Sequence, residues 1–231
     1  MKPEGLASGA NALRYWQARQ NVVANNLANA ETHGFKGERV FARLLGDMVS
    51  PEAVTDLRQG ALMPTERPLD LAIDGDGFFV VDTPAGQRLS RGGPFKLDTD
   101  GTIVDAAGNA LLGEDGPIRI PESKGEVSVD EAGVVRVDGA PLDRLRIEVP
   151  GADARLQHEG HALFLAEGGT ETVADDGRKV LQGHLESSNV NTMQSMVDMI
   201  DIQRNYAAVH NSMGVVDGMM DTIANRIGRL G

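Results

Sequence analysis

The chain has 231 residues, of which 41% are hydrophobic, so it can bury a core in one large domain or two small ones. Its net charge of −12 argues against general binding to nucleic acid, which requires a basic surface that displaces counterions from phosphate. The absence of cysteine from the sequence excludes a disulfide framework, a cysteine-ligated metal and a thiol nucleophile.

The charge and the turn-forming residues divide the chain into three parts. Residues 1–50 carry a net charge of +2 and residues 185–231 one of −2, so the residues between them carry −12. That middle also holds 19 of the 28 glycines and nine of the ten prolines. We therefore expect an N-terminal helical segment with a linker (1–50), a solvated β-rich domain (51–184) and a C-terminal helix (185–231), with the two ends buried against other protein.

The N-terminal segment has the apolar period of a helix that packs on another helix. Six of its eight positions at alternating steps of three and four are apolar. These positions are Leu6, Gly9, Leu13, Trp16, Gln20, Val23, Leu27 and Ala30.

A stripe of amides lies on the opposite face of the same predicted helix. Asn21, Asn25 and Asn29 are four residues apart, and Asn26 flanks them. Asparagine is a mediocre helix former, and its amide can both donate and accept hydrogen bonds without carrying a charge. We interpret the stripe as a surface that contacts neighbouring subunits; the alternative is a merely solvated polar face.

The middle of the chain contains short β-type runs, and turn signals recur between them about every ten residues. This pattern indicates an all-β domain. The expected strands are Leu69–Ile73, Phe78–Val81, Phe95–Leu97, Thr102–Val104, Ile118–Ile120, Glu126–Val129, Val134–Val137 and Leu145–Val149. A repeated Asp-x-x-Gly pattern joins two pairs of them, at Asp98–Gly101 and Asp130–Gly133. The aspartate of such a turn accepts backbone N–H groups two or three residues on, and the glycine supplies a positive φ.

The sequence contains only weak candidates for a metal or catalytic site. His158 and His161 are three residues apart beside a glycine, whereas a zinc-binding helix needs a spacing of four. Asp98 and Asp100 hint at a calcium loop, but Asn109 stands where a bidentate glutamate is required. We therefore expect no metal, no cofactor and no enzyme activity.

The C-terminal segment carries a longer apolar seam than the N-terminal one. Ten positions at alternating steps of three and four are all apolar, as in the a and d positions of a coiled coil. They are Met199, Ile202, Tyr206, Val209, Met213, Val216, Met220, Ile223, Ile227 and Leu230. Met193, Val197 and Ile200 are apolar but lie off this seam. They could contact a second partner or cover the adjoining β domain.

These patterns predict an α+β fold. An exposed apolar stripe of this length requires a partner helix, and the N-terminal helix is the economical partner for the C-terminal one. We expect the two to pair as an antiparallel or bundled coiled coil, with a central all-β domain of short antiparallel strands between them. No run reaches the ~18 apolar residues of a membrane span, and residues 1–14 lack the apolar core of a signal peptide.

Six segments resemble those of the bacterial flagellar rod and hook proteins, in the order found in that family. They are residues 24–36 (ANNLANAETHGFK), 74–79 (DGDGFF), 90–95 (SRGGPF), 183–191 (GHLESSNVN), 196–200 (MVDMI) and 203–206 (QRNY). The resemblance covers nearly the whole chain. It implies an axial component of the flagellar basal body, with an inner layer of paired terminal helices and an outer layer of β domains.

The resemblance also implies partners and assembly residues. The partners would be copies of the chain, other rod and hook subunits, and the flagellar type III apparatus, which exports family members without a cleaved signal. The assembly residues from the N-terminal motif would be Asn21, Asn25, Asn26, Leu27, Asn29, Thr32, Gly34 and Phe35. From the C-terminal motif they would be Ser188, Asn189, Val190, Asn191, Met196 and Gln203, together with the seam from Met199 to Ile227.

Two alternatives stay open. Only about thirty residues join Phe35-Lys36 to Arg67-Pro68, which favours the proximal rod type over the distal rod type with its longer insertion. The function from another class is a secreted β-rich binding module that oligomerises through its coiled coil.

Overall fold

The chain folds into two compact units, which each contain separated parts of the sequence. The computed structural model describes residues 4–45, 48–121, 125–160, 162–172 and 178–227. The unit that we call the helical unit comprises residues 1–28, 38–54 and 191–231, and the β unit comprises residues 29–37 and 55–190. The chain therefore passes from one unit to the other four times.

Two helices dominate the helical unit. Helix α1 spans Glu4–Ala28 and helix α2 spans Thr192–Ile227. Neither contains proline, which would interrupt the backbone hydrogen bonds of a helix. Asn191 caps the start of α2, because its Oδ1 accepts the backbone N–H of Gln194 at 3.0 Å.

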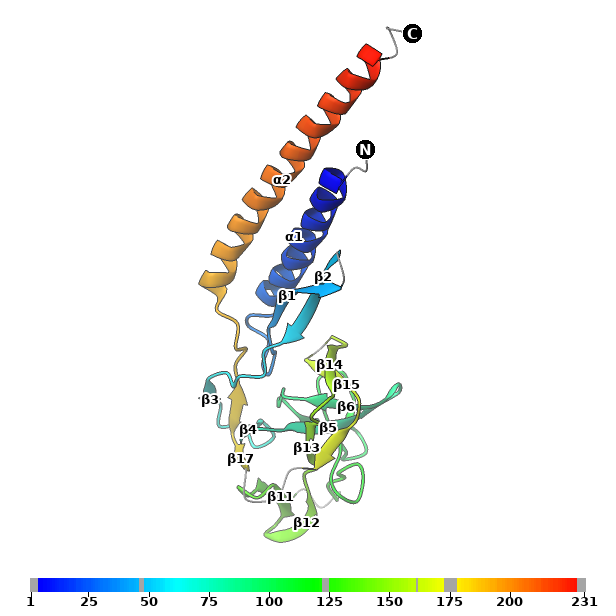
Figure 1. Cartoon of the computed structure of the whole chain (residues 1–231). Helices are drawn as coiled ribbons and strands as arrows, with labels where there is room; N and C mark the ends of the chain where they lie inside the picture. Colours follow the sequence, from blue (N-terminus) through cyan, green and yellow to red (C-terminus); the bar gives the residue numbers. More distant parts are fainter. Residues whose placement is uncertain (1–3, 46–47, 122–124, 161, 173–177, 228–231) are drawn as a thin grey trace. The chain divides into compact units, whose positions relative to one another are not determined.

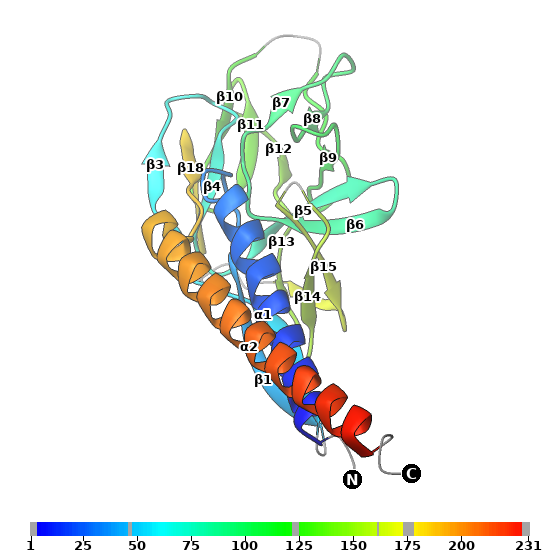
Figure 2. The same cartoon turned by 90° about the horizontal axis from the view of Figure 1, so that it is seen from above.

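The two helices lie side by side and run in opposite directions (Figures 1 and 2). Strands β1 (Glu38–Leu45) and β2 (Met48–Thr55) form a two-stranded sheet, and β1 packs against α1. The expected order of a helix at each end and strands between them is thus confirmed. These two strands were not among the expected ones.

The β unit contains antiparallel strands in several sheets. The largest has nine strands in the order β14-β15-β6-β5-β9-β8-β7, with β13 on β5 and β16 on β13. Its strands are β5 (Phe78–Thr83), β6 (Gly86–Ser90), β7 (Lys96–Leu97), β8 (Ile103–Val104), β9 (Ala110–Leu111), β13 (Ile147–Pro150), β14 (Arg155–His158), β15 (Leu163–Glu167) and β16 (Thr170–Thr172).

Smaller sheets complete the unit. Strands β10 (Val127–Val129), β11 (Val134–Val137) and β12 (Ala140–Arg144) form one sheet. Strand β17 (Arg178–Gln182) pairs with β4 (Leu71–Gly75), and β18 (His184–Glu186) pairs with β3 (Leu62–Pro64). The last two pairings join segments more than 100 residues apart in the sequence. The beginning and the end of the β unit are therefore hydrogen-bonded to each other.

The larger of two apolar clusters forms most of the core of the β unit. Phe79 and Phe95 meet edge to face with ring centroids 5.6 Å apart. Aliphatic side chains from three of the sheets surround them, among them Leu71, Ile103 and Val135. Because only 4% of the residues are aromatic, the core is filled chiefly by Leu, Ile and Val.

The two predicted Asp-x-x-Gly turns are present. Asp98 Oδ1 accepts the N–H groups of the residues two and four positions on, at 2.9 and 2.8 Å, and Asp130 Oδ1 accepts the equivalent pair at 3.1 and 3.0 Å. Asp105 makes a third turn of this kind, which was not among the predicted ones. Ile118–Ile120 was expected to be a strand, but Arg119 makes only an isolated bridge to Thr102.

Among the described helices, none is long and apolar enough to cross a membrane.

Candidate functional site

The predicted seam of α2 is the side of that helix which α1 covers. Ile202 is 1% exposed, and Met199, Tyr206, Val209 and Met213 are half-buried, whereas the residues between them are mostly exposed. The covering weakens toward the end of the helix, where Val216 is exposed. The side chains of Met220, Ile223 and Ile227 lie outside the described set, as does residue 230.

Gly9 sets the distance between the helices. A Cβ atom at Gly9 would come within 2.8 Å of Met213 Cγ and Sδ, so no larger residue fits there without moving Met213. The other described seam positions of α1 are half-buried; they are Leu13, Trp16, Gln20, Val23 and Leu27. At Gly9 and Met213, positions from the two patterns thus lie next to each other in the helical unit.

The amides of α1 have different surroundings. Asn21 and Asn25 are exposed, as a contact surface requires. Asn26 is buried, and its amide binds the chain itself: Nδ2 donates to the Glu38 carbonyl at 2.8 Å, and Oδ1 accepts the Glu38 N–H at 2.9 Å. Asn29 lies in the β unit, where Thr32 Oγ1 donates to its Oδ1 at 3.3 Å. Asn26 thus has a structural task within the helical unit.

A buried cluster of charges lies where the N- and C-terminal motifs meet in the β unit. Lys36 Nζ is 2.6 Å from Glu186 Oε1, and Arg91 Nε is 2.6 Å from Glu186 Oε2. Each of these side chains is at most 4% exposed. We call these three residues the anchor cluster. They come from three of the segments that resemble the rod and hook proteins.

The backbone around the anchor cluster satisfies its remaining hydrogen-bonding groups. Glu186 Oε1 also accepts the Gly60 N–H at 2.8 Å, and Lys36 Nζ donates to the Arg58 carbonyl at 2.9 Å. The Arg91 guanidinium donates to the carbonyls of Ile73, Gly75 and Gly77 around the β4–β5 turn. One carboxylate therefore holds two cations, and the cluster carries a net buried charge of +1.

Burial lowers the pKa of Lys36 from its ordinary value of 10.5, although the hydrogen bond and charge of Glu186 act in the opposite direction. The Arg91 charge lowers the pKa further. Between the folded-state pKa of Lys36 and 10.5, the unfolded chain binds more protons than the folded chain. The free energy of unfolding should therefore rise with pH in that window.

A comparison with Lys36→Met tests this pH dependence. Wild type should gain stability relative to the variant as the pH is raised toward 10.5, and urea unfolding at several pH values measures the difference. If wild type instead lost stability relative to the variant across the same window, the charge balance of the anchor cluster would be wrong.

Gly34, in the N-terminal motif, lies where a side chain has no room. Its φ is +70°, and a Cβ atom there would lie 2.3 Å from the Gly92 backbone nitrogen. Backbone atoms cannot move aside as a flexible side chain can. We expect Gly34→Ala to cost more than the ~1–2 kcal/mol of left-handed strain alone.

Gly139 offers the matched control for that prediction. Its φ is +80°, but no atom lies within 4 Å of the position of its Cβ. Gly139→Ala should therefore show the strain without the clash. Equal losses of unfolding free energy in the two variants would mean that the close approach at Gly34 has no energetic weight.

Asn189 gathers three backbone segments in the β unit. Its Nδ2 donates to the carbonyls of Asp56 at 2.7 Å and Arg58 at 2.8 Å, and its Oδ1 accepts the Gly37 N–H at 2.8 Å. Ser188 Oγ accepts the Val190 N–H at 3.2 Å beside it. Asn189, like Glu186 three residues earlier, thus binds other segments through its side chain.

Phe35 is buried against a histidine that was considered as a metal ligand. Its ring stacks on His158 with centroids 5.1 Å apart, and Phe164 lies on His158 at 4.3 Å. His158 Nε2 is 2.9 Å from the Lys36 carbonyl oxygen, so this nitrogen carries a proton and donates. His158 therefore fixes the end of the N-terminal motif; residue 161 lies outside the described residues.

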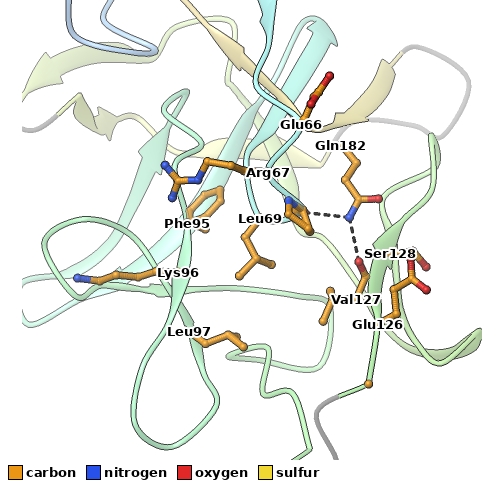
Figure 3. Close-up of a pocket in the computed structure, with 13 residues that line it drawn as sticks. Glu66, Arg67, Leu69, Phe95, Lys96, Leu97, Glu126, Val127, Ser128 and Gln182 are labelled. Atoms are coloured by element: carbon orange, nitrogen blue, oxygen red, sulfur yellow. Dashed lines mark hydrogen bonds between the residues drawn. The ribbon is translucent and has the colours of Figure 1, made fainter.

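The β unit also has an open pocket of about 800 Å³ (Figure 3). Leu69, Phe95, Leu97 and Val127 supply its apolar lining, and charged residues of both signs surround them. The Gln182 amide donates to the carbonyls of Pro68 and Val127, which caps the outer edge of β10 (Figure 3). None of the predicted site residues lines this pocket.

Sequence reasoning missed the anchor cluster, although all three of its residues lie in segments that it singled out. The available signal was a charged residue inside a glycine-rich or apolar motif: Lys36 after Gly34-Phe35, Arg91 before Gly92-Gly93, and Glu186 after an apolar residue. Charged residues are rarely buried without a partner, so such positions justify a search for one.

Three sequence-family models match the chain. The one described as "Flagella basal body rod protein" matches residues 6–36, "Flagellar hook protein FlgE/F/G D1 domain" matches 72–137, and "Flagellar basal body rod FlgEFG protein C-terminal" matches 181–227. The flagellar basal-body rod protein FlgF of Rhizobium meliloti (strain 1021) is 31% identical, over 95% of this chain and 97% of the relative. The chain belongs to the flagellar basal-body rod protein family.

Further members of the rod protein family are similar to the same extent. FlgG of Bacillus subtilis (strain 168) is 30% identical over 95% of this chain and 97% of its own length. FlgF of Escherichia coli (strain K12) is 31% identical over 86% of this chain and 88% of its own length. Rod proteins are structural proteins, so the chain is not an enzyme.

The rod-family matches fall on the segments that the anchor cluster joins. The N-terminal match ends at Lys36, and the C-terminal match, which begins at residue 181, includes Glu186 and Asn189. The two cations and the carboxylate thus connect the regions that identify the family.

Proposed function

We propose that the chain is an axial subunit of the rod of the flagellar basal body, which polymerises through its terminal helices and transmits torque by mechanical continuity. In this proposal residues 1–50 and 185–231 supply the helical layer of the rod, and residues 51–184 supply its outer layer. The neighbouring subunits are copies of the chain and other rod and hook proteins.

One observation carries the proposal. Among the side chains that the structure describes, 13 large hydrophobic ones are exposed, and seven of these are on α2. They are Met193, Met196, Val197, Ile200, Val215, Val216 and Met219. Met193 is 77% exposed and Val197 53%, and by helical spacing both lie opposite the seam. A helix that is apolar on two sides requires two partners, and α1 is only one of them.

The pairing of α1 with α2 belongs to the same proposal. The alternating steps of three and four, together with the closeness of Gly9 and Met213, support a coiled-coil geometry in which each seam residue fits between residues of the other helix. A stiff helix pair would resist bending more than a single helix would.

We further propose the proximal rod type. Alignment to FlgF of R. meliloti spans 234 residues and alignment to FlgG of B. subtilis spans 261, for the same 95% of this chain. The longer alignment contains more gaps, in keeping with a longer insertion in the distal type. We place the subunit in the periplasmic rod, exported by the flagellar type III apparatus without a cleaved signal.

Swimming of a strain that lacks the chain tests this function. A full-length copy should restore swimming, and a copy without residues 192–231 should not, while its β unit stays folded because Glu186 and Asn189 are kept. Swimming with the shortened copy would contradict assembly through α2. If the shortened copy instead bound a ligand in the pocket of the β unit, the binding-module alternative would gain support.

A further inference from the structure

Three of the segments that connect the two units are fastened together in the β unit. The unit boundaries fall after residues 28, 37, 54 and 190. Residues 29–37, 55–60 and 187–190 are therefore the connecting segments that enter or leave the β unit there. Without further contacts, each would carry any load on its own as a flexible peptide.

The Asn189 amide uses both of its N–H groups and its oxygen on these segments. Its two N–H groups donate to Asp56 and Arg58 in the second segment, and its oxygen accepts from Gly37 in the first. The backbone adds a direct link between those two segments, because Asp56 N–H donates to the Gly37 carbonyl at 2.7 Å. One side chain thus joins all three segments. It does so close to the unit boundaries, because Gly37 is the last residue of the first segment and Asn189 precedes the last residue of the third.

Glu186 repeats the same connection three residues earlier. Its carboxylate binds Lys36 in the first segment and Gly60 in the second, and its carbonyl accepts the Gly34 N–H at 2.8 Å. These bonds are buried, so water competes with them poorly. Two side chains of one short stretch therefore hold the same pair of neighbouring segments.

We propose that Asn189 and Glu186 form a load-sharing fastening, through which force that arrives along α2 is distributed over all three connecting segments before it reaches the β sheets. The direction from which force arrives rests on the proposed rod function; the fastening itself rests on the hydrogen bonds above. Asn189 acts by holding the three segments together. Its bonds are pulled at the same time, so they resist more force than the same bonds broken one after another.

Mechanical unfolding of single full-length chains tests the fastening. Because the natural sequence has no cysteine, two engineered cysteines are unique handles. One pair, Gln194→Cys with Asp100→Cys, sends force from α2 through the fastening. The control pair, Asp100→Cys with Glu171→Cys, pulls within the β unit and bypasses it.

Asn189→Ala should break at least about tenfold faster than wild type at fixed force with the first pair of handles, because it removes all three side-chain hydrogen bonds, and should match wild type with the control pair. Asn189→Asp should break faster still, because its carboxylate not only lacks both donors but also faces the Asp56 and Arg58 carbonyl oxygens, which repel a negative charge. Circular dichroism verifies folding, and Asn189→Ser, which keeps one donor, replaces Asn189→Ala if the latter does not fold.

Equal acceleration with both handle pairs would mean that Asn189 only stabilises the fold, and no acceleration with either would mean that it bears no load; both results overturn the inference. The measurement uses isolated chains, so it stands apart from the rod function. If the wild-type chain showed the directional effect but did not restore swimming, the proposed rod function would be contradicted and the proposed fastening would be retained.

Discussion

Glu186→Gln should lower the free energy of unfolding of the β unit by about 3–5 kcal/mol, the usual cost of breaking a buried ion pair from one side. Glutamine keeps the shape of the side chain but leaves Lys36 and Arg91 buried together without a counter-charge. Urea unfolding followed by far-ultraviolet circular dichroism measures the loss. Trp16, the single tryptophan, lies in α1, so its fluorescence reports separately on the helical unit.

Lys36→Met is the matched control for that substitution. It removes one of the two cations, whereas Arg91 and the Gly60 N–H still bind the carboxylate, so no buried charge is left alone. Its cost should stay below about 2 kcal/mol. If Lys36→Met destabilised the chain as much as Glu186→Gln, the carboxylate would not be the centre of the cluster.

Val197→Asp should abolish swimming while leaving the isolated subunit as stable as wild type to within about 0.5 kcal/mol. Val197 is exposed in the subunit, so the charge costs little there. Against a neighbouring subunit the same carboxylate would have to be buried without a partner, at a cost of several kcal/mol. Swimming assays and circular dichroism of the purified variant give the two readouts.

Asn205→Asp provides the control on the same helix. It introduces the same charge at an exposed position of α2, and none of its neighbours three or four residues away belongs to the seven exposed apolar residues. Swimming should be retained. Loss of swimming in both variants would mean that any added charge on α2 prevents assembly, and the special role of the apolar face would be withdrawn.

The helices were predictable because their information is local and periodic. The steps of three and four from Met199 to Met213 place a residue on the same side of the helix each time, and that side proved to be the covered one. The Asp-x-x-Gly turns were predictable for a related reason, since the bonds that Asp98 and Asp130 make reach only four residues along the chain.

The pairing of the strands at the borders of the β unit could not be predicted in this way. Strand β3 pairs with β18 and β4 with β17, and neither partner can be read from local alternation. Such pairs are set by which distant segment covers the core. The sheet of β1 and β2 was not predicted either. It packs against α1, and this contact between separate elements leaves no local pattern in the sequence.

The candidate site divides along the same line. The seam and the exposed apolar residues of α2 follow from the helical period, so sequence alone could single them out. The anchor cluster joins residues up to 150 positions apart, and a buried lysine reads in sequence like any solvent-exposed one. Asn189 was named from the resemblance, but its three bonds became visible only when Gly37, Asp56 and Arg58 were placed around it.

Electron microscopy of basal bodies from a strain that lacks this chain tests the central proposal most directly. If the chain is an axial subunit of the rod, the rods should stop short of their full length, and a full-length copy of the chain should restore them. Complete rods in the strain without the chain would contradict the proposal.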